Sequence, residues 1–167
     1  MSTTATLSTE LSDLLSTLAK HRDFLRFTVR GMSDDQARQA PTASALSLGG
    51  LIKHVRSTEE GWMRFAVGGA EAMESVPSDW ENGFRMLADE TLEGLLADYE
   101  ETAAKTERLL HDLDLDTAHP LPVAPWFEQG ASWTVRRVVL HLIAETSQHA
   151  GHADIIRETL DGQKTMG

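Results

Sequence analysis

The sequence lacks cysteine and long apolar runs, and each absence excludes a class of protein. Without cysteine, the 167-residue chain can form no disulfide, no thiolate metal site and no cysteine nucleophile. Any bound metal must therefore be held by histidine, aspartate or glutamate, and any thiol chemistry must use a thiol from another molecule. No stretch approaches the run of about 18 apolar residues that a transmembrane helix requires.

Basic residues are also scarce, since 15 lysines and arginines face 26 acidic residues and the formal net charge is −11. An acidic surface repels phosphate backbones, so we expect no nucleic-acid partner. The first residues show neither the basic region, the apolar stretch nor the cleavage site of a secretory signal. We therefore expect a cytoplasmic protein that does not associate with membranes.

What is present favours an all-α fold in one domain covering residues 1–167. Hydrophobic residues make up 41% and charged residues 25%, as in ordinary globular domains, and a chain of this length buries a sufficient core without a structural metal. Alternating patterns are weak, whereas apolar residues recur at three- and four-residue steps. This spacing predicts helices over 7–30, 48–67 and 91–113, and a fourth that begins after a cap at Ser132 or Thr134 and runs to about 160.

Two irregular stretches, 70–88 and 114–131, separate these helices. The second holds three of the five prolines, and Gly68-Gly69 and Asp161-Gly162 supply helix stops. Four long helices that each carry one apolar stripe bury those stripes as a four-helix bundle. The sequence thus predicts a four-helix bundle with long connections after the second and third helices.

Histidines and one glutamate fall among core-type positions of two of these helices. His141, Glu145 and His149 follow one another at four-residue steps, which places them on one helix face. His54 shares a face with apolar residues of the 48–67 helix. A carboxylate or an imidazole directed into a bundle core is costly unless it is paired or bound to a metal.

The residue types and their spacing allow two interpretations of these side chains. Facing helices of a bundle often build metal sites, and two histidines with one glutamate leave a vacant coordination position, as in catalytic zinc centres. Zinc, nickel, cobalt or iron would accept such ligands. Alternatively, they are hydrogen-bonded core residues or solvated neighbours, which is how we interpret His21, His111 and His119.

Two segments resemble a known family: LSLGGLIKHV at 46–55 and WTVRRVVLHLIAETSQHAGHADIIRE at 133–158. They resemble the DinB-like superfamily of metal-binding four-helix bundles, in particular the branch with mycothiol S-transferases and the metal-binding domain of mycothiol-dependent maleylpyruvate isomerase. Many DinB-like proteins use three histidines, whereas here Glu145 takes one position, as in the mycothiol branch. The resemblance covers essentially the whole chain. It implies His54, Glu145 and His149 as ligands of a divalent metal, with zinc foremost.

The resemblance implies a metal-dependent thiol S-transferase that activates a low-molecular-weight thiol, mycothiol, for attack on an electrophilic substrate. It also implies a homodimer. Isomerase activity is not implied, because the second domain of the isomerase has no counterpart here. A non-catalytic, stress-related metal-binding bundle and a metal-dependent hydrolase remain as alternatives.

Further side chains are candidates for supporting roles. His152 lies three residues after His149 and is expected beside the ligands, as a partner or as an acid/base group, with His141 as a weaker candidate. Arg56, Glu60 and Arg64 are candidate contacts of the thiol's sugar. The aromatic residues Trp126, Phe127 and Trp133 form either a pocket wall or plain packing. Asp154 and Arg157 are either solvated charges or an ion pair between helices.

Overall fold

A computed structural model describes residues 8–77, 79 and 81–165 of the chain, which form an all-α fold with a very small sheet. Its elements are α1 (Thr9–Thr28), α2 (Asp34–Arg38), α3 (Leu48–Glu74), α4 (Leu92–Asp112), β1 (Ala118–Pro120), β2 (Ser132–Thr134) and α5 (Val135–Asp161). The four long helices confirm the predicted all-α class. The predicted start of the first helix at Leu7 lies outside the described residues.

Hydroxyl side chains begin every helix in the described part of the chain. Each accepts a hydrogen bond from a backbone N–H three residues further on, which satisfies a donor that has no partner within the helix. The capping residues are Ser8, Ser33, Ser47, Thr91 and Thr134. Of the two predicted caps of the last helix, Thr134 is the correct one, and Ser132 lies in β2.

Helix α3 is longer than predicted and is kinked. Gly69 has a φ of +72°, a conformation that side chains with a Cβ rarely adopt. The glycine pair therefore interrupts the helix where the sequence predicts its end, but helical structure resumes and continues to Glu74. The ring of His119 lies against Gly69, with its Nε2 atom 3.2 Å from the carbonyl oxygen of Ala66.

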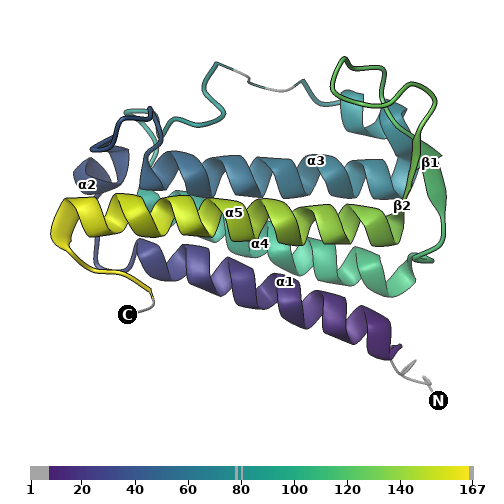
Figure 1. Cartoon of the computed structure of the whole chain (residues 1–167), viewed down its shortest axis with the longest axis horizontal. Coiled ribbons are helices and arrows are strands. Elements are labelled where there is room, and N and C mark those ends of the chain that lie inside the picture. Colours follow the sequence, from purple (N-terminus) through teal and green to yellow (C-terminus); the bar gives the residue numbers. More distant parts are fainter. Residues whose placement is uncertain (1–7, 78, 80, 166–167) are drawn as a thin grey trace.

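The helices pack in an order that the long connections make possible. Helix α1 packs mainly against α5, and α3 packs against both α4 and α5. Figure 1 shows α3 and α4 running in the same direction, because the segment between them returns along the outside of α3. The order is therefore not a simple up-down-up-down one. No helix in the described residues has the length and apolar character needed to cross a membrane.

The connection between α4 and α5 contains a small sheet that the periodicity did not predict. Strands β1 and β2 pair antiparallel, with Ala118 opposite Thr134, and the backbone N–H of Val135 continues the pairing to Thr117 at 2.9 Å. Strands of three residues are too short to show an alternating pattern. This pairing ties the start of α5 to the end of α4.

A layer of polar side chains separates two apolar clusters in the core. One cluster includes Leu25, Val55 and Tyr99, and the other includes Leu18, Trp62 and Leu110. Between them lies the polar layer, formed by the buried residues Arg22, Glu59, Thr106 and Thr146. Arg22 donates to both carboxylate oxygens of Glu59 at 3.1 and 2.5 Å, and the Thr106 hydroxyl donates to Glu59 Oε1 at 2.6 Å.

Arg157 has neither of the two predicted roles, that of a solvated charge or that of an ion pair between helices. It is buried, and its Nη1 donates to the carbonyl oxygens of Thr28 and Arg30 at 2.7 and 2.9 Å. Its Nε lies 2.9 Å from Asp161, and this hydrogen bond lowers the pKa of the Asp161 carboxyl. Arg157 thus satisfies carbonyls at the end of α1 and fixes α5 against it.

Candidate metal centre

His54 of α3 and Glu145 and His149 of α5 converge, and we call them the His–Glu–His site. One ligand atom from each lies within 4.8 Å of the other two. Glu145 Oε2 is 3.5 Å from His149 Nε2 and 3.8 Å from His54 Nε2. The packing of α3 against α5 therefore brings together two side chains one turn apart and a third that is distant in sequence.

The spacing of these three groups fits a bound divalent ion. Bonds of about 2.0–2.2 Å in a tetrahedral centre separate neighbouring ligand atoms by roughly 3.4 Å. The carboxylate oxygen lies 3.5 and 3.8 Å from the two ring nitrogens, and both separations are close to this value. The donor set of two nitrogens and one oxygen is also one that zinc accepts.

The charge state of Glu145 suits a metal ligand. The facing imidazoles of His149 and then His54 hold the pKa of its carboxyl well below the usual range, although partial burial acts in the opposite direction. Its side chain is 28% exposed, so solvent reaches the centre of the site. The site therefore offers an ionised carboxylate that a small molecule can approach.

His152 lies beside His149, where the sequence predicts a supporting residue. The Nδ1 atoms of the two rings are 3.3 Å apart, within hydrogen-bond distance. His149 thus turns Nδ1 towards His152 and Nε2 towards Glu145. Histidines that bind metals usually donate a hydrogen bond from their second ring nitrogen, which fixes the ring orientation. The geometry suits that arrangement.

His141 stands on the other side of Glu145, against an aromatic cluster. Its Nε2 is 4.0 Å from Glu145 Oε1, and burial is the main cause that lowers its pKa. Its ring meets those of Trp62 and Trp133 at centroid distances of 4.9 and 5.2 Å. Trp62 and Trp133 stack at 4.7 Å, so aromatic rings form a wall one helical turn from Glu145.

The three aromatic residues before α5 contribute unequally to this wall. Phe127 packs edge-on against Trp62 and Trp133, each at 6.0 Å, and is therefore part of it. Trp126 contacts Phe127 at 6.2 Å and is 67% exposed. Trp133 and Phe127 thus reach the site region, and Trp126 extends the aromatic surface outwards.

Phe84 is a residue of the site that the sequence analysis missed. Its ring stacks on His54 with centroids 3.7 Å apart and lies 5.9 Å from His149. A Cβ at Gly50 would overlap the carbonyl of Phe84, so glycine permits this approach. Lys53 donates to the carbonyl of Arg85 at 3.3 Å and helps to hold the segment. Phe84 therefore covers one face of His54.

The candidate contacts of the thiol's sugar and two further histidines lie away from the His–Glu–His site. Arg56, Glu60 and Arg64 lie on the side of α3 that faces α4, where Arg56 is 3.9 Å from Asp98. They are therefore not grouped with His54, and the structure gives no support for a thiol-sugar contact at the His–Glu–His site from them. His21 meets Phe24 and His111 is exposed on α4, away from the site.

Comparisons with known proteins agree with this architecture. A solved structure described as a conserved protein from Enterococcus faecalis has a TM-score of 0.69 and 16% sequence identity, and the match covers 95% of this chain and 100% of the other. At this identity the likeness shows the fold alone. The comparison with curated proteins gives no match. The sequence model of the mycothiol-S-transferase family matches residues 13–162, and the chain therefore belongs to the mycothiol S-transferase family.

Proposed function

We propose that the protein is a metal-dependent thiol S-transferase that joins mycothiol to an electrophilic substrate. The observation that carries the proposal is the convergence of His54, Glu145 and His149 at the spacing of metal ligands, in a chain of the mycothiol S-transferase family. The family match supports the thiol and the type of reaction. The site geometry supports the dependence on a metal.

The three side chains of the His–Glu–His site are the proposed metal ligands, and zinc is the ion that best matches them. The chemistry supplied by such an ion is a lowered thiol pKa, so that the sulfur is deprotonated at neutral pH. The partial exposure of Glu145 leaves this centre open to a small thiol. Because the chain has no cysteine, the reacting sulfur has to come from that thiol.

In the transfer itself, the thiol loses its proton, the sulfur forms a bond to an electrophilic carbon, and a leaving group departs with its bonding pair. His152 holds the His149 ring through the Nδ1 contact, which leaves its own Nε2 to exchange a proton. The wall of Trp62, Phe127 and Trp133 excludes water from one side and suits an apolar electrophile.

The proposal extends to the organisation of the chain. Residues of α1, α3, α4 and α5 contribute to the same core clusters, which supports a single domain over 1–167. We propose a cytoplasmic homodimer, as the resemblance of the sequence to the family implies.

Conjugation of monochlorobimane to mycothiol tests the proposal. We expect turnover by the zinc-loaded protein, loss of turnover after chelation and recovery when zinc is restored. The His149→Ala variant should be inactive, whereas the control variant His111→Ala, altered at an exposed histidine of α4, should match the wild type.

Two results would contradict the proposal. Metal-dependent turnover of an ester or amide substrate without any thiol would indicate a hydrolase. Stoichiometric metal binding without turnover of a panel of electrophiles, in the presence of mycothiol, would indicate a metal-binding protein that is not an enzyme.

A further inference from the structure

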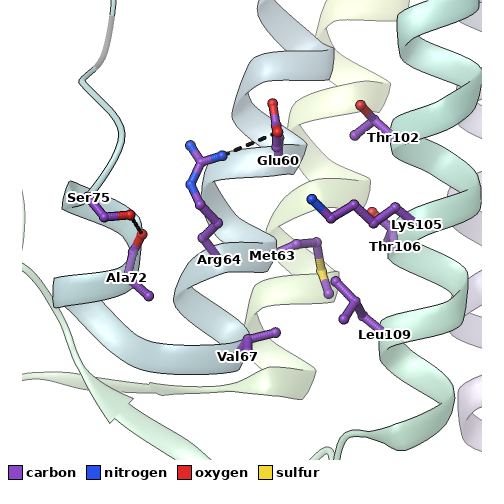
Figure 2. Close-up of a pocket in the computed structure, with 10 residues that line it drawn as sticks. All are labelled: Glu60, Met63, Arg64, Val67, Ala72, Ser75, Thr102, Lys105, Thr106 and Leu109. Carbon is purple, nitrogen blue, oxygen red and sulfur yellow. Dashed lines mark hydrogen bonds and ion pairs between the residues drawn. The ribbon is translucent and has the colours of Figure 1, made fainter.

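A cavity of about 270 Å³ lies between α3 and α4, and none of the residues of the His–Glu–His site lines it. Figure 2 shows Arg64 on the α3 wall and Lys105 reaching from α4 towards α3. Met63 and Val67 of α3 and Leu109 of α4 supply apolar surface. The cavity thus combines an apolar body with charged groups on opposite walls.

The charge of this cavity is opposite to that of the molecule. Arg64 and Lys105 bring two positive charges and Glu60 brings one negative charge, in a chain whose net charge is −11. Arg64 Nη1 is 3.4 Å from Glu60 Oε1, whereas no carboxylate among the described residues pairs with Lys105. Glu60 is shared with Arg56, whose Nη1 lies 3.7 Å from its Oε2, so the lining of the cavity carries at least one positive charge that Glu60 does not neutralise. A monoanion would neutralise it.

Arg64 also has an unused hydrogen-bond donor. Its Nε atom is buried and has no hydrogen-bond partner in the described structure. A buried donor without a partner is costly, and a ligand is one of the explanations for such a group. A carboxylate suits a guanidinium edge because two oxygens can accept two parallel N–H donors.

We propose that the α3–α4 cavity binds a small organic acid with an apolar body of a few carbon atoms. The carboxylate lies between Arg64 and Lys105, and the apolar body lies against Met63, Val67 and Leu109. Glu60 pairs with Arg64, so the positive charge of Lys105 remains for a ligand. A single negative charge matches it, which favours a carboxylate over an inorganic phosphate dianion. This site is separate from the proposed metal centre and does not depend on it.

Titration calorimetry with hexanoate tests the site, with hexanamide as the uncharged probe and inorganic phosphate as the probe without an apolar body. We expect hexanoate to bind and both others to bind at least about tenfold more weakly, since hexanamide lacks the charge and phosphate lacks the apolar body that the cavity would accept. Methyl NMR signals of Val67 and Leu109 should shift with hexanoate.

Variants locate the binding. Lys105→Gln should weaken hexanoate about tenfold or more, and Lys105 is exposed and makes no ion pair among the described residues, so this change preserves the fold. The control Lys20→Gln removes the same charge from an exposed position of α1 and should bind as the wild type does. Arg64→Lys keeps the charge but loses the two-donor edge, and should bind more weakly.

The proposal is overturned if hexanoate fails to bind at millimolar concentration, if hexanamide or phosphate binds as well as hexanoate, or if Lys105→Gln binds like Lys20→Gln. The His149→Ala variant should retain hexanoate binding. Loss of binding in that variant would place the acid at the His–Glu–His site and would also contradict the proposal.

Discussion

Two glutamates of the bundle, Glu59 on α3 and Glu145 on α5, stand in opposite environments. Glu59 is 1% exposed, and Arg22 and Thr106 donate three hydrogen bonds to its two oxygens. Glu145 is 28% exposed and faces three imidazoles at 3.5 to 4.0 Å. One carboxylate is saturated by donors of the protein, whereas the other is charged and open.

The contrast separates a carboxylate whose partners all belong to the protein from one that a ligand can still reach. The partners of Glu59, a guanidinium and a hydroxyl, donate to both of its oxygens inside the core and leave no place for a ligand. The partners of Glu145 are histidines, whose ring nitrogens can bind a cation as readily as they donate a proton. The two glutamates should therefore respond differently to substitution.

The largest effect on stability is expected at Glu59. Glu59→Ala leaves the buried Arg22 with only the half-exposed Glu107, 3.6 Å away, as a carboxylate partner, and should lower the free energy of unfolding by about 3–5 kcal/mol in urea titrations. Glu145→Ala should change it by about 1 kcal/mol or less, because that carboxylate is partly exposed and its neighbours are histidines at 3.5 Å or more. Similar losses in the free energy of unfolding at the two positions would show that the two carboxylates do not differ in this way.

A paired replacement sharpens this test. The double variant Arg22→Met, Glu59→Leu removes both charges together and should recover most of the stability lost in Glu59→Ala, since no buried charge is left unpaired. A double variant as unstable as the single one would show that the ion pair is not the reason for the loss.

A smaller effect is expected at His152, through His149. His152→Ala removes the partner of His149 Nδ1 and should weaken zinc binding about 10–100-fold, measured by competition with a chromophoric chelator. His111→Ala serves as the matched control because this histidine is exposed on α4. Unchanged affinity in His152→Ala would show that His149 needs no such partner.

The smallest effect is expected at Phe84, which covers His54 without a polar contact. Phe84→Ala should speed the loss of zinc to a chelator by a factor of a few, because the apolar surroundings of a metal limit the access of solvent. Phe84→Leu keeps an apolar cover and should lie between the wild type and Phe84→Ala. Equal rates in all three proteins would remove Phe84 from the site.

The sequence predicts the long helices well because their periodicity and caps agree. Thr134 caps α5, and Gly162 ends it in the left-handed conformation. The short β1–β2 pairing and the continuation of α3 beyond Gly69 depend on contacts between distant segments, such as His119 against Gly69. Local patterns carry no signal of such contacts.

The site is predictable from sequence only in part. Four-residue spacing places Glu145 and His149 on one face, but their meeting with His54 requires the packing of α3 against α5, which the family resemblance anticipated. Phe84 could not be predicted, because its place is set by the path of the returning segment over Gly50 and Lys53.

Metal content of the purified protein is the decisive measurement for the His–Glu–His site. Plasma mass spectrometry should find one divalent ion per chain in the wild type and almost none in His149→Ala, whose circular dichroism should stay close to that of the wild type because the core does not need the metal to fold. Full metal occupancy in His149→Ala would contradict the claim that His54, Glu145 and His149 together hold the ion.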